Sequence, residues 1–264
     1  MRLTATRPAG GTMSLAEHLG ELRRRAVRAA IALAAGMVAG WFLADVVLAL
    51  LRDPIAVAAL QQDRPVALNF TSVSAAFDLR VQIAVVAGIV IASPVWLYQL
   101  FAFFMPALSR RERRYTLGFT FAALPLFLAG CAAGIWVVPH IVALLTAFAP
   151  ADSLTYLDAR SYFDFVLRLV LITGVAFVLP LVLVLLNFAG VVSGVAILKA
   201  WRWAVLSICL FTAIATPAAD VMAMLLLAIP MVLLYVGACG VALLSDRRRS
   251  RALSATIDLP AVEV

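Results

Sequence analysis

The stretch "SRRERRYTLGFTFAALPLFLAGCAAGIWVV", residues 109–138, joins a cluster of four arginines to a long run without charge. The apolar part, Tyr115–Val138, is long enough to cross a bilayer as a helix, which needs about 20 residues. Arginines beside a span favour the cytoplasmic side of the membrane. The stretch therefore predicts a transmembrane helix together with its orientation.

The same pattern recurs along the chain. Six apolar runs are found, at Ala29–Leu50, Val81–Leu97, Tyr115–Val138, Phe165–Val192, Trp201–Ala215 and Val221–Leu244. The 264 residues are 65% hydrophobic and 13% charged, whereas soluble domains are nearer half apolar and a quarter charged. We predict an all-α membrane protein of six transmembrane helices, the fifth about one turn shorter than an ordinary span.

The basic residues predict the orientation of the chain. If the N-terminus is cytoplasmic, 16 of the 21 lysines and arginines lie in cytoplasmic segments. The two long outer loops, roughly 51–80 and 139–163, then hold only four. This bias predicts that both termini are cytoplasmic. It also explains the net charge of +7 by membrane topology, so no nucleic-acid partner is expected.

The expected division of the chain has three parts. Residues 1–13 form a flexible cytoplasmic N-terminus, residues 14–244 the membrane domain, and residues 245–264 a cytoplasmic tail. Ser14 to Glu17 fits a capping box, which predicts an amphipathic helix on the inner face before the first span. The first apolar run has no small-residue cleavage site, so we expect it to remain in the mature protein.

Four prolines, Pro94, Pro125, Pro180 and Pro230, lie in or near the ends of apolar runs. A proline inside a membrane helix bends it and frees carbonyl groups that neighbours must satisfy. Two interpretations stay open from the sequence. The prolines produce either ordinary helix curvature or a bundle bent into a concave wall.

A catalytic function is not expected. The segment "GVVSG", Gly190–Gly194, faintly resembles an intramembrane serine nucleophile site, with His140 as its base. The predicted topology places Ser193 and His140 at opposite faces of the bilayer, far beyond hydrogen-bond reach. The three cysteines lie inside apolar runs, and no metal-ligand spacing or phosphate-binding loop is present, so no cofactor is expected.

One charged pair lies inside a predicted span. Asp164 and Arg168 are four residues apart, so on a helix they can neutralise each other. Arg168 could also extend towards the outer interface. We favour a polar patch that faces a water-filled cavity or a partner helix. The alternative function is a small-solute secondary transporter using this pair, although the inverted repeats common in transporters are absent from the sequence.

Two acidic residues of the inner face stand out. Glu21 precedes Arg25 by one helical turn, so a local ion pair explains it. Glu112 lies among the arginines of "SRRERRY", but on a helix those arginines at i±1 and i±2 point elsewhere. Glu112 is therefore available for a cationic ligand.

Several separated motifs agree with one known family. "EHLGELRRR" at 17–25 is similar to H-L-x-E-L-R-x-R, and "SPVWLYQLFAFFMPALSRRERR" at 93–114 to Y-Q-x-W-x-F-x-x-P-x-L-x-x-x-E-R. "ATPAADVMAMLLLAIPM" at 215–231 is similar to a short turn between two final helices, and Pro54 follows the first span. From about Ser14 to Leu244 the chain resembles TatC, the signal-peptide receptor subunit of the twin-arginine translocase.

The resemblance implies a binding site. Its ligands would be the paired arginines in signal peptides of folded preproteins, read by Glu21 and Glu112. Carboxylate–guanidinium contacts are charge-assisted and can be bidentate, which suits this task. Phe103 occupies the family's essential aromatic position. Arg23 and Gln99 fall at further motif positions and would orient the site.

The resemblance also implies a setting. The kinked helices would form a glove-like bundle in a bacterial inner membrane, surrounded by lipid. Single-span TatA- and TatB-type subunits would join it in a multimeric complex driven by the proton-motive force, without nucleotide. Further candidates for partner contact or structure are Pro54, Asp164, Arg168, Pro180 and Asp220.

The chain departs from the family at three positions. Val178 stands two residues before Pro180, where the family usually has a glutamate. Met224 replaces a frequent polar residue, and Phe101 replaces the motif tryptophan. These changes predict altered partner contacts, with Asp164 and Arg168 as replacement polar groups.

Overall fold

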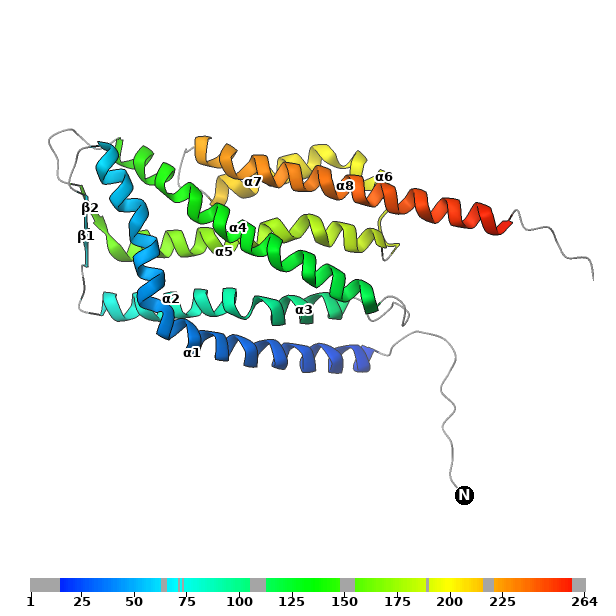
Figure 1. Cartoon of the computed structure of the whole chain (residues 1–264), viewed down its shortest axis with the longest axis horizontal. Helices are drawn as coiled ribbons and strands as arrows, with labels where there is room; N and C mark the ends of the chain where they lie inside the picture. Colours follow the sequence, from blue (N-terminus) through cyan, green and yellow to red (C-terminus); the bar gives the residue numbers. More distant parts are fainter. Residues whose placement is uncertain are drawn as a thin grey trace, which may run out of the picture.

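The computed structural model describes residues 15–62, 66–70, 72, 74–104, 113–147, 155–188, 190–215 and 221–257. Figure 1 shows a bundle of helices joined at one end by a short ribbon of two strands. The elements are α1 (Leu15–Gln62), β1 (Val66–Asn69), α2 (Ala75–Ile91), α3 (Ser93–Phe104), α4 (Arg113–Ala147), β2 (Thr155–Asp158), α5 (Ala159–Phe188), α6 (Gly194–Lys199), α7 (Trp201–Ala215) and α8 (Val221–Ile257).

The predicted helical membrane architecture is confirmed. Among the described residues, α1, α4, α5 and α8 are each long and apolar enough to cross a membrane, and α2 with α3 meets the same criteria as a bent pair. The number of six spans stays a prediction. Helix α7 coincides with the short fifth run and has only 15 residues. It covers about 22 Å at 1.5 Å per residue, which is less than the hydrocarbon thickness of about 30 Å.

The two outer segments differ from the predicted loops. Helix α1 continues to Gln62, so Pro54 lies within it, and α4 continues to Ala147. Strands β1 and β2 then pair in parallel, with Val66 opposite Thr155 and Asn69 opposite Asp158. The prediction of long loops was wrong because it counted only apolar residues. Backbone groups at the membrane surface also need hydrogen-bond partners, and helix ends and a ribbon supply them.

Two helices continue across boundaries expected from the sequence, while the division into cytoplasmic tails and a membrane domain stays a prediction. The expected separate surface helix is part of α1, which begins at Leu15 and continues through the first span. Helix α8 continues through the expected tail to Ile257. No proline or glycine lies between Leu244 and Ile257 to stop it. Ser14 lies outside the described residues, so its capping role stays a prediction.

One proline coincides with a break. Helices α2 and α3 meet at 56° beside Ala92, two residues before Pro94. Proline lacks an N–H and cannot continue the backbone ladder. The indole Nε1 of Trp96 donates a hydrogen bond of 3.0 Å to the carbonyl of Ile89 and so satisfies a group at the break. Pro125, Pro180 and Pro230 lie inside uninterrupted helices.

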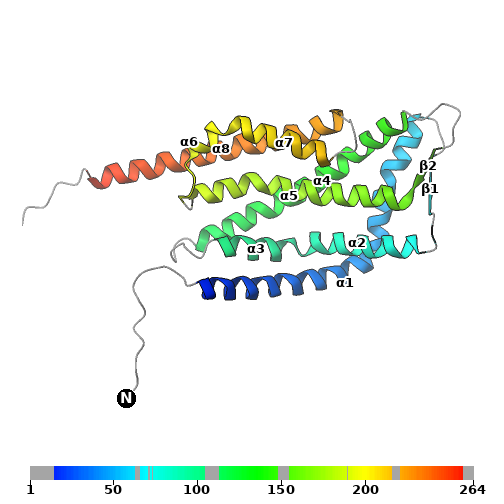
Figure 2. The same ribbon diagram turned by 180° about the vertical axis from the view of Figure 1, so that it is seen from behind.

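Glycines allow two helix pairs to approach at backbone distance. A Cβ atom on Gly36 or Gly40 of α1 would lie 2.5 Å from a backbone oxygen of α2. Gly130 and Gly134 of α4 meet Thr173 and its neighbours on α5 in the same way. Each pair is separated by three residues, the spacing that lets membrane helices pack closely. The crossings hold α1 against α2 and α4 against α5 (Figure 2).

A polar cluster joins three helices at the other end of the bundle from the ribbon. The carboxylate of Asp246 accepts hydrogen bonds from Asn187 Nδ2 at 2.9 Å and from the backbone N–H of Gly194 at 2.6 Å. The hydroxyl of Tyr235 donates to the carbonyl of Ile197 at 2.6 Å. Helix α6 is thereby held against α8, and the turn before it is secured to the end of α5.

The glycine crossing generates a prediction. Gly88→Ala would place a Cβ atom 2.6 Å from the backbone nitrogen of Met37. Because neither backbone can move freely, overpacking should destabilise the fold by about 1–3 kcal/mol. Thermal unfolding of the purified protein in detergent measures the loss.

Gly237→Ala is the matched control, since a Cβ atom there has no neighbour within 4 Å in the structure as described. Its unfolding temperature should be unchanged or higher, because alanine favours helix. Equal unfolding temperatures for Gly88→Ala and the wild type would contradict the close crossing.

Candidate functional site

The predicted ligand-binding residues gather where α1 begins and α3 ends. Figure 1 shows the start of α1, the end of α3 and the start of α4 at the same end of the bundle. The rings of His18 and Phe103 stack there, with centroids 4.8 Å apart and planes at 29°. His18 was not among the binding residues predicted from the sequence. The feature of the sequence that could have identified His18 is its position three residues before Glu21, which places both on the same helix face.

Glu21 is paired within its own helix, as predicted. Its Oε1 atom accepts from Arg25 Nε at 3.0 Å and from Arg25 Nη2 at 2.5 Å. Both side chains are about one-fifth exposed. The second oxygen, Oε2, is buried and has no hydrogen-bond partner among the described residues. Half of the carboxylate is therefore unsatisfied, and that state is costly for a buried charged group.

Gln99, on the facing helix α3, also has an unsatisfied side-chain oxygen. Its Oε1 atom is also buried without a hydrogen-bond partner in the described part of the chain. Helices α1 and α3 run antiparallel (Figure 2). Since Glu21 follows His18 by three residues and Gln99 precedes Phe103 by four, both lie one turn from the stacked rings. Two unsatisfied acceptors thus lie at about the same level of the α1–α3 seam, where they favour a ligand rich in N–H donors.

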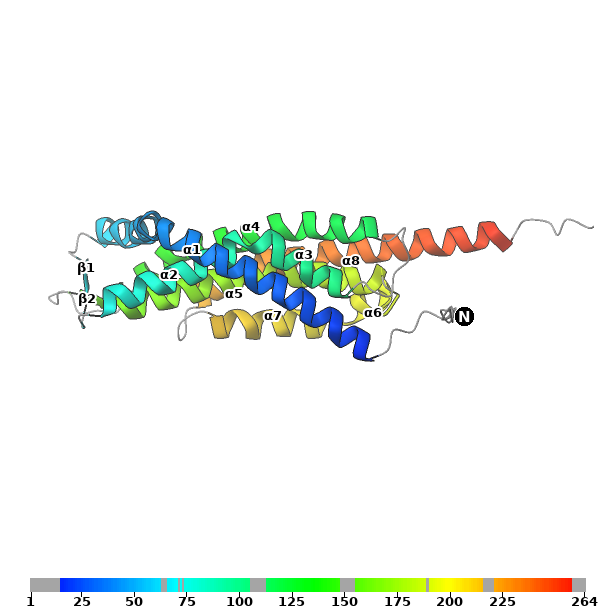
Figure 3. The same cartoon turned by 90° about the horizontal axis from the view of Figure 1, so that it is seen from below.

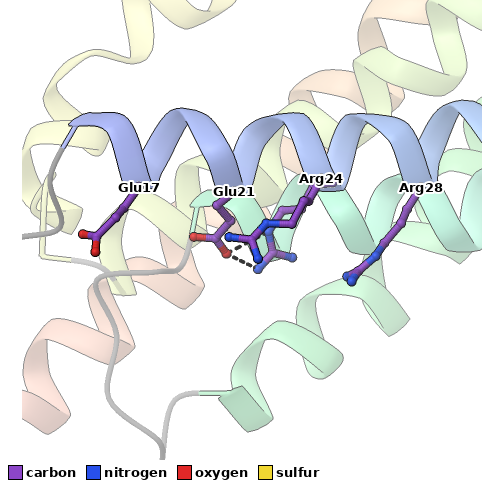
Figure 4. Close-up of a pocket in the computed structure, with 5 residues that line it drawn as sticks. Glu17, Glu21, Arg24 and Arg28 are labelled. Atoms are coloured by element: carbon purple, nitrogen blue, oxygen red, sulfur yellow. Dashed lines mark hydrogen bonds and ion pairs between the residues drawn. The ribbon is translucent and has the colours of Figure 1, made fainter. Parts of the chain in front are cut away.

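A cavity of about 370 Å³ opens along α1 beside this seam. Its lining combines two carboxylates with three guanidiniums, from Glu17, Glu21, Arg24, Arg25 and Arg28. Figure 4 shows the Glu21 ion pair between Glu17 and Arg28 on one side of the helix. Arg23, the further predicted residue, is exposed and lines an adjoining cavity instead.

Two predicted residues lie outside the described part of the chain. Glu112 immediately precedes α4, which begins at Arg113, and Asp220 immediately precedes α8, which begins at Val221. The roles predicted for both therefore stay predictions.

The intramembrane pair of Asp164 and Arg168 is confirmed, with Arg168 Nη2 2.6 Å from Asp164 Oδ2. Gln82 of α2 also donates a hydrogen bond to Asp164, a partner that sequence reasoning missed. Gln82 could have been recognised from the sequence because its amide side chain lies in the otherwise apolar run Val81–Leu97. The side chain of Arg168 is 72% exposed, whereas that of Asp164 is 30% exposed. The cluster links α2 to α5 and presents one guanidinium outwards.

Further ion pairs lie nearer the ribbon. Arg80 contacts Asp45 at 2.9 Å and lies 5.2 Å from the ring centre of Trp41. Arg160 contacts Asp78 at 3.4 Å. These contacts tie α1 to α2 and α2 to α5. Arg80 and Arg160 are thus each paired with an acid, which lowers the electrostatic cost of a charge near a bilayer.

The hydrolase interpretation is not supported by the structure. The side chain of Ser193 accepts a hydrogen bond from Ala196 N at 3.2 Å and caps the first turn of α6. His140 packs against Trp136 in the last part of α4, which ends at Ala147. Among the described residues, no group of three or more metal-ligating side chains is found.

Two of the three departures from the family motif, Phe101 and Val178, are buried in the bundle. Phe101 is fully buried, and Val178 and Pro180 on α5 are buried as well. A glutamate in place of Val178 would therefore face the interior of this bundle. Any contact with a partner helix must use other residues, and Arg168 has the exposure for it.

Comparison with known proteins identifies the relatives of the chain. The family model described as Sec-independent protein translocase protein (TatC) matches residues 17–230. A protein of that name from Xylanimonas cellulosilytica is 46% identical over 239 residues, which cover 90% of this chain and 87% of the relative. The protein of the same name from Rothia mucilaginosa is 36% identical, covering 92% and 83%.

Solved structures agree. A crystal structure described as the twin arginine translocase receptor TatC has a TM-score of 0.70 and 29% identity to this chain. The superposition covers 87% of this chain and 99% of the crystallised one. A second crystal structure of such a receptor, in DDM, has a TM-score of 0.72 and 30% identity. The sequence of the chain and its helical bundle therefore agree with the same family.

Proposed function

The chain belongs to the TatC family, and we propose that its α1–α3 end recognises paired-arginine signal peptides of folded preproteins. It is a receptor subunit of the twin-arginine translocase, a membrane protein of protein transport. The observation that carries the binding proposal is that Glu21 Oε2 and Gln99 Oε1 are both buried without a hydrogen-bond partner among the described residues. Each lies about one helical turn from the stacked rings of His18 and Phe103. A guanidinium carries five N–H donors in a planar fork and can satisfy both.

The proposed recognition is an exchange of ion pairs. Without a ligand, Arg25 forms an ion pair with Glu21. An arginine of the signal peptide would therefore have to compete with the guanidinium of Arg25. Arg25 contacts only one carboxylate oxygen, whereas a fork-shaped contact uses both. A signal lysine could supply only a point charge and would displace Arg25 poorly. The resident pair therefore acts as a filter for arginine.

Phe103 and Glu112 complete the proposed site. Phe103 stacks on His18 and so joins the end of α3 to the start of α1, on which Glu21 lies. Glu112, one residue before α4, would receive the second signal arginine. Arg23 would orient the peptide from the exposed side of α1. Two acids at different elements suit two adjacent arginines better than one acid does.

The wider setting belongs to the same proposal. We infer a bacterial inner membrane location with both termini cytoplasmic, because the arginines concentrate at the α1–α3 end. The chain works with other Tat subunits, and we propose single-span TatA- and TatB-type partners in a multimeric complex. The proton-motive force would supply the energy. Arg168, exposed from α5, is the proposed polar contact for a partner span.

The receptor proposal predicts a pattern of crosslinks. A twin-arginine signal peptide with a photoreactive group beside its arginine pair should crosslink to the start of α1 in native membranes. Glu21→Gln and Glu112→Gln should each weaken crosslinking by roughly tenfold or more, since a hydrogen bond to a charged group contributes about 1.5–3 kcal/mol. Glu112→Ala should also abolish export without preventing insertion.

Asp45→Asn is the control for this experiment, because it removes a carboxylate from the outer part of α1. Its crosslinking should match the wild type. Equal crosslinking of a peptide with two lysines in place of the arginines would refute arginine recognition.

The exchange of ion pairs predicts an opposite effect for one arginine. Arg25→Gln removes the resident competitor and should tighten binding of the arginine peptide by about two- to fivefold, because such pairs contribute about 0.5–1 kcal/mol. Peptide affinity of the purified protein measures this. Arg24→Gln removes the same charge from the same cavity but leaves Glu21 paired, so it should give a smaller gain. Weaker binding in Arg25→Gln would mean that Arg25 holds the peptide itself.

The partner proposal predicts a separation of two phenotypes. Arg168→Gln should reduce recovery of the assembled complex severalfold while signal-peptide crosslinking stays near the wild-type level. Co-purification with the single-span subunits measures assembly. Arg160→Gln, the other outer arginine of α5, is the matched control and should assemble normally. Normal assembly of Arg168→Gln would leave Arg168 as an interfacial anchor only.

A further inference from the structure

The outward face of α1 carries a second cavity, of which the receptor proposal uses only Arg23. It measures about 440 Å³ and is lined by Gly20, Arg23, Arg24, Val27 and Arg28. None of these residues is acidic, in contrast to the neighbouring cavity that contains Glu17 and Glu21. Arg24 and Arg28 border both cavities and separate the acidic seam from the outward face. The outward cavity thus has the chemistry of an anion site.

The arginines of this face are not neutralised within the structure. Among the described residues, Arg23, Arg24 and Arg28 are exposed and form no ion pair. Arg24 Nε donates instead to the carbonyl of Gly20 at 3.3 Å. Arg25 differs, because it forms an ion pair with Glu21. Three guanidiniums are therefore available to one ligand on one side of the helix.

An apolar stripe continues from these arginines along the same face. Ile31, Val38 and Phe42 follow Arg28 at spacings that keep them above one another on a helix. They are 65%, 62% and 75% exposed, respectively. Gly36 and Gly40 lie on the opposite side, where α1 packs against α2. The helix face thus changes from cationic to apolar over about one turn.

We propose that this face binds an anionic phospholipid of the inner leaflet, with its phosphate on Arg23, Arg24 and Arg28 and an acyl chain along Ile31, Val38 and Phe42. Guanidiniums bind phosphate oxygens through parallel N–H donors. The arginines immediately precede the apolar run that starts at Ala29, so they lie at the depth of the headgroups. Arg23 is shared with the signal-peptide proposal, so the test below changes Arg24 and Arg28, which that proposal does not assign to the peptide.

The order of cationic and apolar residues along α1 indicates which ligand fits this face. A phospholipid is an anion joined to a long apolar chain, which is the order found along α1 from Arg24 to Phe42. Free phosphate would use the arginines but leave the stripe uncovered. A zwitterionic lipid has a phosphate too, but its choline cation would lie beside three guanidiniums. The site therefore favours a phospholipid with net negative charge.

Native mass spectrometry of the purified wild-type chain with defined lipids tests the proposal. Phosphatidylglycerol should be retained and phosphatidylcholine lost under the same conditions. Arg24→Gln/Arg28→Gln should weaken phosphatidylglycerol binding by about 30-fold, since each arginine near an anionic lipid contributes about 1 kcal/mol. Arg24→Lys/Arg28→Lys retains the charge and should lose much less.

Arg247→Gln/Arg248→Gln on α8 is the matched control, because both arginines are exposed and the change in net charge is the same. Its phosphatidylglycerol binding should stay within about twofold of the wild type. Equal losses in the two double variants would overturn the site, since they would indicate general attraction only. Equal retention of the two lipids, or full displacement by millimolar inorganic phosphate, would overturn it as well.

Discussion

The bundle depends on glycine-lined crossings of its helices. In a bilayer, apolar side chains gain little by leaving lipid for one another, so helices associate where their backbones can approach closely. Gly36 and Gly40 provide such a surface on α1 against α2, and Gly130 and Gly134 provide one on α4 against α5. Because α2 turns into α3 beside Pro94, the first crossing also brings α3 back along the start of α1. The stacked rings of His18 and Phe103 lie where the end of α3 meets the start of α1. The site at the α1–α3 seam is therefore a consequence of how α1 crosses α2.

The two ends of the molecule treat charge differently. Towards the ribbon, arginines are matched with acids, as in the pairs of Arg80 with Asp45 and Arg160 with Asp78. At the α1–α3 end, Glu21 keeps one buried oxygen without a partner among the described residues, and exposed arginines lie beside it. Unsatisfied polar groups cost stability, and a protein tolerates them where a ligand supplies the missing contacts. Arg80 Nε, towards the ribbon, is also buried without a hydrogen-bond partner among the described residues. The α1–α3 end is therefore distinguished by an unsatisfied carboxylate oxygen, which is the acceptor that the proposed arginine ligand requires.

Helix α1 packs against α2 and α3 with one side only, and Figure 3 shows it along the edge of the bundle. Its inward side carries His18 and Glu21 towards α3, and its outward side carries Arg24 and Arg28 above exposed apolar residues. The arginine run "RRR" at 23–25 is divided between these sides by the helical turn of about 100° per residue. Arg25 pairs with Glu21, whereas Arg23 and Arg24 are exposed. One basic cluster in the sequence is therefore divided in the structure into a paired arginine and two exposed ones.

Long apolar runs and the bias of basic residues were sufficient to predict a helical membrane protein, and the separated motifs were sufficient to predict its family. These features are local, because a span is defined by its own length and hydrophobicity. The pair of Asp164 with Arg168 was predictable for the same reason, since four residues make one helical turn. The sequence did not predict the parallel ribbon of β1 and β2, the partnership of Gln82 with Asp164 or the stacking of His18 on Phe103. Those contacts join residues that are far apart in the chain, and only the tertiary packing at the glycine crossings brings them together. The unsatisfied oxygens of Glu21 and Gln99 likewise arise from burial, which the arrangement of α1 against α3 decides and no local pattern encodes.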